Sequence, residues 1–159
     1  MGKTSEEFMR QRESEPKDMY AEQQQEMEQW RKDNKDLTIS LEKCNLVFVY
    51  GTLRKGYGNN RLLSGSIFLG KGKTTNKYAL YGIGCPVVSD KEQVSRIVGE
   101  VYQLSHEYQL KILDSLEGHP DFYKRKVIDV NLDDNNKQIN AWIYICNDRF
   151  SGTLIESGD

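Results

Sequence analysis

One carboxylate in this sequence is distinguished by its position at the end of a predicted helix. Glu117 closes a segment, residues 105–117, that Gly118 and Pro120 end, because glycine supplies a left-handed terminal residue and proline cannot continue a helix. Acids are disfavoured at this negative end of the helix dipole, but the dipole contributes only about 0.3–1 kcal/mol. A proton-transfer role near neutral pH therefore also requires that Glu117 face a largely apolar pocket. The alternative is an ordinary surface acid.

The same helix carries an apolar stripe that should pack on a core. Tyr108, Ile112 and Leu116 recur at every fourth position, so they share one helix face. Ser105 is the predicted N-cap, because serine is among the residues preferred at the start of a helix. These features predict the one long helix of the globular domain.

A second group that could do chemistry follows a buried strand. Residues 46–50 are continuously apolar, as expected for a strand buried on both faces, and the run stops at Gly51 and Thr52. Glycine lets the backbone come close to a ligand, and consecutive N–H groups can form a nest that binds anions. A substrate carboxylate or amide oxygen could dock there. The alternative is an ordinary strand-to-loop turn.

Four segments, in this order along the chain, resemble the γ-glutamylcyclotransferase-like family, particularly its γ-glutamylamine cyclotransferase branch. They are Val47-Phe-Val-Tyr-Gly-Thr-Leu-Arg54, Val98-Gly-Glu-Val-Tyr102, Leu113-Asp-Ser-Leu-Glu-Gly118 with Tyr123-Lys-Arg125, and Ala141-Trp-Ile-Tyr144. The resemblance covers about residues 45–148. Two departures are Leu116, where many relatives carry an aromatic residue, and a long N-terminal extension.

The resemblance implies both a fold and a set of site residues. The fold is α+β, a small mixed β-barrel with one packed helix and a cavity at one end. Glu117 aligns with the catalytic acid/base of the family. The residues implied in substrate binding are Tyr50, Gly51, Thr52, Leu53 and Tyr123.

The implied reaction converts a γ-glutamyl amide to 5-oxoproline and a free amine, and it needs no cofactor. The α-amine of the substrate attacks its own γ-carbonyl, so the enzyme mainly fixes a reactive conformer and moves one proton. Two alternatives remain open. The chain could be a non-catalytic relative that binds a metabolite, or an adaptor that acts through residues 1–44.

Other ionisable residues have weaker claims on the site. Glu100 is the competing carboxylate, and the alternation of residues 98–102 could point it inward as a supporting or structural acid. Arg125 is explained as well by a structural ion pair as by substrate contact. His119 is expected to be exposed, and Cys85, before a proline, is expected in a turn.

Composition excludes several other classes of protein. The net charge of −2 lacks the basic surplus of a nucleic-acid binder, and no apolar run approaches the roughly 20 residues of a membrane span. Two histidines and three widely spaced cysteines make no zinc pattern, so no metal is expected. An odd number of scattered cysteines indicates reduced thiols in a cytoplasmic compartment.

The chain is expected to divide into three parts. Residues 1–44 form a polar, acidic extension, partly disordered or helical over 18–35, and a candidate segment for binding a protein partner. Residues 45–148 form the cyclotransferase-like domain, and residues 149–159 form a loose tail. A turn is expected near residues 60–63, a hairpin loop at 133–136, and short strands at 46–50, 66–70, 74–81, 96–104, 123–132 and 138–147.

Overall fold

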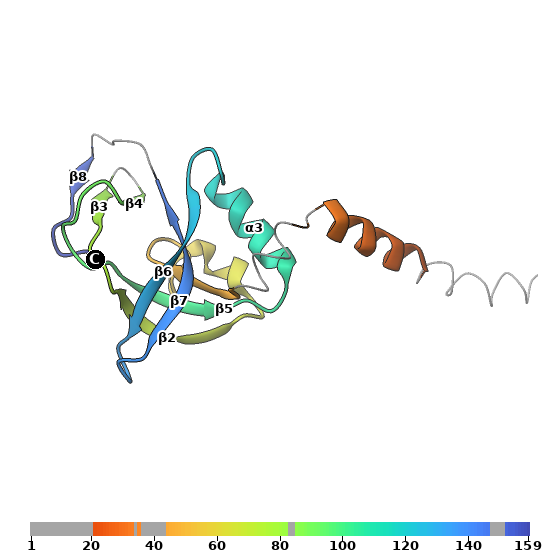
Figure 1. Ribbon diagram of the computed structural model, residues 1–159, viewed down its shortest axis with the longest axis horizontal. Helices are drawn as coiled ribbons and strands as arrows, with labels where there is room; N and C mark the ends of the chain where they lie inside the picture. The colour runs from red at the N-terminus through yellow and green to blue at the C-terminus, as the bar shows by residue number, and fades with distance from the viewer. Residues whose placement is uncertain (1–20, 34, 36–43, 83–84, 147–151) are drawn as a thin grey trace, which may run out of the picture. The chain divides into compact units, whose positions relative to one another are not determined.

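The computed structural model describes residues 21–33, 35, 44–82, 85–146 and 152–159 (Figure 1). The chain divides into two compact units, residues 1–38 and 39–159. In the first unit residues 21–33 are helical, which confirms the predicted helix over that range, while residues 18–20, where the helix was expected to begin, lie outside the described residues. Among the described helices none is both long enough and apolar enough to cross a bilayer.

Five strands of the second unit close into a barrel, which confirms the predicted fold class (Figure 1). Around the barrel the strands are β1 (Leu46–Val49), β5 (Val98–Gln103), β2 (Ile67–Thr74), β6 (Lys124–Leu132) and β7 (Gln138–Ile145). The pairing of β1 with β7 is parallel and the other pairings are antiparallel, so the barrel is mixed. The turn expected near residues 60–63 is a 3-10 helix, η1 (Gly58–Leu63), and residues 133–136 link β6 to β7 as expected.

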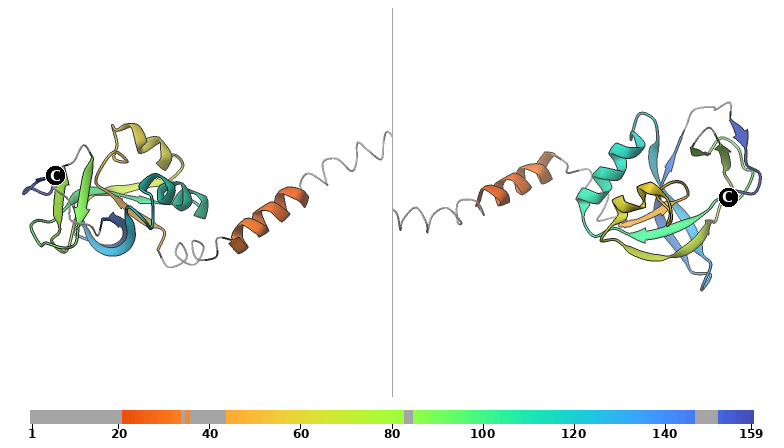
Figure 2. Two further views of the ribbon diagram at one scale, coloured as in Figure 1. Left: turned by 90° about the horizontal axis from the view of Figure 1, so that it is seen from above. Right: turned by 180° about the vertical axis from the view of Figure 1, so that it is seen from behind.

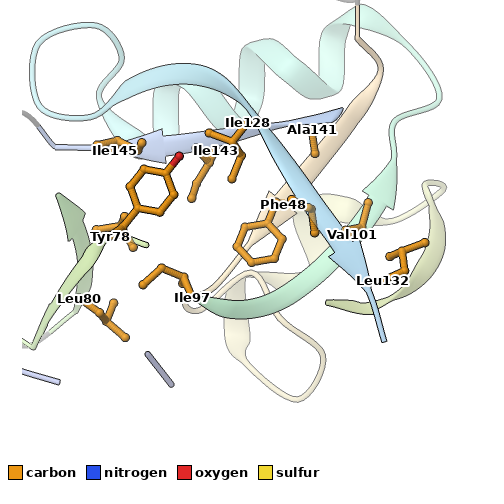
Figure 3. Close-up of a cluster of buried hydrophobic side chains, with 12 residues drawn as sticks. Phe48, Tyr78, Leu80, Ile97, Val101, Ile128, Leu132, Ala141, Ile143 and Ile145 are labelled. Atoms are coloured by element: carbon orange, nitrogen blue, oxygen red, sulfur yellow. The ribbon is translucent and has the colours of Figure 1, made fainter. Parts of the chain in front are cut away.

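The barrel is filled by apolar side chains from β1, β5, β6 and β7 and from the neighbouring sheet. Figure 3 shows Phe48, Val101, Ile128 and Ile143 among the buried side chains that converge there. Gly99 of β5 is required by this packing, because a Cβ atom at that position would lie 2.5 Å from the Phe48 ring and 2.5 Å from a backbone carbonyl oxygen. The apolar run of β1 is therefore buried, as predicted.

A second, three-stranded sheet lies beside the barrel. Its strands are β4 (Pro86–Ser89), β3 (Ala79–Gly82) and β8 (Thr153–Leu154), in that order. The predicted strand over 74–81 is wrong, because β2 continues to Thr74 and β3 begins only at Ala79. β4 was not predicted, because a proline after Cys85 suggested a turn; proline is tolerated here as the first residue of a strand.

The prediction of a loose C-terminal tail is wrong for residues 153–159. β8 pairs with β3, the Ile155 N–H donates to the Leu80 carbonyl, and the Val98 N–H donates to the carbonyl of buried Gly158. These backbone hydrogen bonds attach the last residues to both sheets. The sequence carried little sign of this, because the segment is short and polar.

The helix α3 (Glu107–Glu117) packs on the opposite side of the domain from the small sheet, as Figures 1 and 2 both show. The predicted apolar stripe is wrong: Tyr108 and Leu116 are 54% and 42% exposed. The N-cap is also His106 rather than Ser105. The buried face instead consists of Gln109, Leu110, Leu113 and Asp114. Two of its four residues are polar and find buried hydrogen-bond partners, so an apolar pattern could not reveal it.

Candidate active site

A cavity of about 430 Å³ opens at the end of the barrel where β1 stops and α3 ends. Every residue that the sequence singled out for catalysis or substrate binding lies in its wall. The lining residues are Phe48, Val49, Tyr50, Gly51, Thr52, Leu53, Asn59, Cys85, Pro86, Ser115, Leu116, Glu117, Gly118, Phe122, Tyr123 and Tyr144.

Glu117 reaches the cavity because α3 ends there. Gly118 adopts the left-handed conformation with φ of 66°, as predicted, and its N–H donates to the Ser115 carbonyl. The Tyr123 N–H donates to the carbonyl of Glu117 at 3.3 Å, which ties the start of the next strand to the helix end. Burial among mostly apolar and aromatic groups raises the pKa of the Glu117 carboxyl to about 7. The carboxyl can therefore exchange a proton near neutral pH.

The loop that follows β1 forms the other side of the cavity. The Gly51 carbonyl accepts hydrogen bonds from the backbone N–H and the Nε–H of Arg54, which bends the chain into a turn. Asn60 Nδ2 donates to the Leu53 carbonyl at 2.8 Å and fixes the far end of the loop. Within the part of the chain that the structure describes, the N–H groups of Gly51, Thr52 and Leu53 have no protein acceptor.

Three tyrosines of the wall use their hydroxyls to join separate segments of the fold. The Tyr50 hydroxyl donates to the Tyr144 carbonyl at 2.7 Å and accepts from the Val88 N–H at 3.3 Å. The Tyr123 hydroxyl donates to the Pro86 carbonyl at 3.2 Å. Burial raises the pKa of the Tyr50, Tyr123 and Tyr144 phenols well above the ordinary value, so all three remain neutral. Among the described carboxyl and phenol groups of the wall, Glu117 is the one that titrates near neutrality.

A buried ion pair lies behind the cavity wall. Arg125 Nε and Nη2 contact the two carboxylate oxygens of Asp114 at 2.8 and 3.2 Å, and the guanidinium lies 4.6 Å from the centre of the Trp142 ring. The Tyr144 hydroxyl also donates to Asp114, at 2.7 Å. Arg125 therefore acts as a structural ion-pair partner, one of the two interpretations of the sequence. Asp114, which the sequence did not single out, connects α3 to β6 and β7.

Two other candidate side chains, Glu100 and His119, lie outside the cavity. Glu100 is buried, but it accepts hydrogen bonds from the Lys55 N–H at 3.0 Å and the Tyr102 hydroxyl at 2.8 Å, as expected of a structural acid. His119 is half-buried rather than exposed, and its Nδ1 accepts from the Arg125 N–H at 3.1 Å. Within the part of the chain that the structure describes, no three His, Cys, Asp or Glu side chains are arranged to hold a metal ion.

Several lining residues were not anticipated from the sequence. Asn59, Cys85, Pro86 and Phe122 carry no local signal for the site, because they come from loops and from a strand that was not predicted. Tyr144 was noted only as part of a closing strand. Alternation along β7 places it on the face opposite to buried Ala141 and Ile143, so the pattern did not indicate that it lines the cavity.

The fold and the site together define a class of protein, a small mixed barrel with one buried carboxylate in a cavity at its end. The chain belongs to the family described as gamma-glutamyl cyclotransferase, AIG2-like, whose model matches residues 47–159. The expectation of a cyclotransferase-type enzyme, drawn from the ordered motifs, is thereby confirmed at the level of the family.

Two relatives illustrate the breadth of the similarity. A protein of Methanocaldococcus jannaschii named "Putative gamma-glutamylcyclotransferase" is 51% identical over 114 residues, which are 71% of this chain and 92% of the relative. The gamma-glutamylaminecyclotransferase of Homo sapiens is 38% identical over 96 residues, 55% of this chain and 62% of the relative.

Solved structures support the same fold. The crystal structure of an AIG2-like protein from Mus musculus superposes with a TM-score of 0.64 at 23% identity, and it covers 72% of this chain and 88% of the mouse chain. YkqA from Bacillus subtilis gives a TM-score of 0.59 at 33% identity over 72% of this chain and 39% of its own.

Proposed function

We propose that this protein converts a γ-glutamyl amine to 5-oxoproline and the free amine, with Glu117 as the only acid/base group. The observation that carries the proposal is the Glu117 carboxyl, which has a pKa of about 7 and shares a cavity with the loop of residues 50–53. A base used at neutral pH works best when its pKa is close to the operating pH.

The reaction begins with a proton transfer from the substrate. Deprotonated Glu117 takes a proton from the α-ammonium group, and the freed amine attacks the γ-carbonyl carbon of the same molecule. A C–N bond closes the five-membered lactam and the carbonyl oxygen gains negative charge. Glu117 then gives its proton to the leaving nitrogen, the old C–N bond breaks, and the carbonyl re-forms. Glu117 also takes the second proton of the ring nitrogen, which leaves a neutral lactam, and passes it to the released amine, which departs as an ammonium ion. Because the nucleophile is already tethered, holding a near-attack conformer supplies several kcal/mol of the barrier reduction.

The loop after β1 supplies the donors for negative charge. The N–H groups of Gly51, Thr52 and Leu53 can bind the α-carboxylate of the substrate or the oxyanion that develops during attack. The Tyr50 and Tyr123 rings form the adjoining walls of the site, while their hydroxyls hold the surrounding strands in place. Removing charge-stabilising donors of this kind typically costs about 10²–10³-fold in kcat.

The proposed chemistry needs no metal or cofactor, because one carboxylate can serve both proton transfers and the substrate brings its own nucleophile. EDTA should accordingly leave the activity unchanged. We place the enzyme in the cytoplasm, where its three cysteines, which are free in the structure, would stay reduced. Residues 1–44 are proposed to contact a protein partner and to take no part in catalysis, so their deletion should leave cyclisation intact.

The proposal is tested with a panel of γ-glutamyl amines, with 5-oxoproline release followed by mass spectrometry. The kcat/KM should rise with pH through a pKa of about 7, because only deprotonated Glu117 accepts a proton. Glu117→Gln should reduce kcat roughly 10²–10⁴-fold, the usual contribution of general acid–base catalysis. Glu156→Gln, an exposed carboxylate outside the cavity, is the matched control. Near-normal turnover by Glu117→Gln would refute the assignment, and saturable binding without release of 5-oxoproline would favour the metabolite-binding alternative.

A further inference from the structure

Two apolar side chains lie in the cavity wall although they remain largely open to solvent. Leu116 is 42% exposed and Phe122 is 49% exposed. Leu116 immediately precedes half-buried Glu117, and Phe122 immediately precedes buried Tyr123. Their partial exposure places them where the cavity meets solvent. We call Leu116 and Phe122 the rim pair.

The rim pair is held in place by the surrounding backbone and rings. The Phe122 N–H donates to the Gly118 carbonyl at 2.8 Å, and the Phe122 ring meets the Tyr123 ring edge to face at 4.9 Å between centroids. Leu116 lies in the last turn of α3, which fixes the position of its backbone. A partner that contacts both side chains therefore meets a preformed apolar surface, which reduces the entropy cost of binding.

The charge distribution of the cavity restricts what the rim pair can contact. Among the described lining residues, Glu117 is the only one with a side chain of Asp, Glu, Lys, Arg or His type. A second carboxylate, on the leaving group, would meet no lining cation. It would need donors beyond the N–H groups of Gly51 to Leu53, which are proposed to serve the α-carboxylate or the oxyanion, and it would approach the Glu117 carboxylate. Burying such a charge without a partner is costly, whereas an alkyl or aryl arm gains from contact with apolar side chains.

We propose that Leu116 and Phe122 are specificity-determining residues that bind the apolar arm of the leaving amine. This inference rests on the proposed function and identifies its substrate class. Preferred substrates are γ-glutamyl amides of amines with an uncharged alkyl or aryl arm of several carbons. Amides whose leaving group carries a carboxylate next to the nitrogen, as in γ-glutamyl-α-amino acids, are disfavoured.

The expected effect follows from the area that each methylene group buries. Full burial of a CH₂ group contributes about 0.8 kcal/mol, which corresponds to about a fourfold change in affinity. Because the rim pair is about half exposed, a gain of roughly twofold to fourfold per methylene is expected until the arm passes the rim. The interaction is present in both the bound and the transition state, so the gain should appear in KM rather than in kcat.

The test compares γ-glutamyl-methylamine, -propylamine, -pentylamine and -benzylamine with γ-glutamylglycine. The wild-type kcat/KM should rise along the alkyl series, and γ-glutamylglycine should fall below the propyl compound, its nearest match in length. Leu116→Ser and Phe122→Ser should each flatten the series by raising KM for the longer arms. Val127→Ser removes an apolar side chain that is 40% exposed but outside the cavity, and it should leave the series unchanged.

Binding measurements separate failure of this inference from failure of the proposed function. The Glu117→Gln variant should bind the amides without converting them, so their dissociation constants can be measured by calorimetry. These dissociation constants should show the same dependence on arm length as kcat/KM. If no amide releases 5-oxoproline from the wild type, the proposed function fails. If the dissociation constants are flat across the series, or if γ-glutamylglycine binds as tightly as the pentyl compound, the role of the rim pair is refuted. Circular dichroism of both serine variants checks that they fold.

Discussion

Replacing Glu117 with glutamine should make the protein more stable at pH 8 although it lowers kcat by orders of magnitude. The carboxyl is half-buried at the end of α3, and this burial raises its pKa from an ordinary 4.5 to about 7. A native carboxyl that binds its proton more tightly than the unfolded chain does makes stability depend on pH. Glutamine has a similar shape and carries no ionisable proton, so it removes this dependence.

The sign and the size of the effect follow from linkage. Below pH 4.5 both states carry the proton and Glu117 costs nothing. Between pH 4.5 and pH 7 the unfolded chain loses the proton first, so the free energy of unfolding falls as pH rises, and above pH 7 the loss stays constant. The shift corresponds to about 3 kcal/mol, because each pKa unit is worth about 1.4 kcal/mol.

The assay is urea unfolding of the wild type and Glu117→Gln at pH 4, 6 and 8. The difference in free energy of unfolding between the two proteins should grow by about 3 kcal/mol in favour of the variant from pH 4 to pH 8. Comparing pH values removes any constant effect of the new amide group. Glu156→Gln, at an exposed position, should show no such growth. A difference independent of pH would mean that Glu117 titrates as a solvated acid, and the proposed base would lose its physical support.

Two further perturbations test the surroundings of the cavity. Asp114→Asn breaks a buried ion pair and should lower the free energy of unfolding, measured by urea titration, by about 3–5 kcal/mol. The control Asp121→Asn, at an exposed position, should change the free energy of unfolding by less than about 0.5 kcal/mol. Equal effects of the two substitutions would contradict the structural role of Asp114. Iodoacetamide should inhibit the enzyme by modifying Cys85, the exposed thiol in the cavity wall, while buried Cys44 and Cys146 react slowly. Cys85→Ser should remain active and resist the reagent, and an inactive variant would place the thiol in the chemistry.

The features predicted correctly are those encoded by neighbouring residues. Gly118 and Pro120 marked the end of α3 within a few residues of Glu117, and the continuous apolar run after residue 45 marked β1. Helix ends and buried strands depend on local backbone preferences and on side chains adjacent in sequence. The ordered motifs added the family and its barrel, which no local pattern could have provided.

The features predicted wrongly are those that depend on distant partners. The buried face of α3 includes Gln109 and Asp114, because the Ser64 carbonyl and Arg125 satisfy their polar groups. β8 is a strand only because β3 offers it a free edge. A polar residue or a short polar segment becomes part of the core when the fold supplies its hydrogen bonds, and the identity of those partners is not written nearby.

The candidate site divides in the same way. The sequence by itself determined that a carboxylate lies at a helix end and that a glycine-containing loop follows a buried strand. Only the tertiary structure decided that the two face one cavity and that Pro86 and Tyr144, from separate strands, complete its wall. It also decided the pKa of Glu117, which burial raises to about 7. Desolvation depends on every group packed around a carboxyl, and chain segments far apart in the sequence supply those groups.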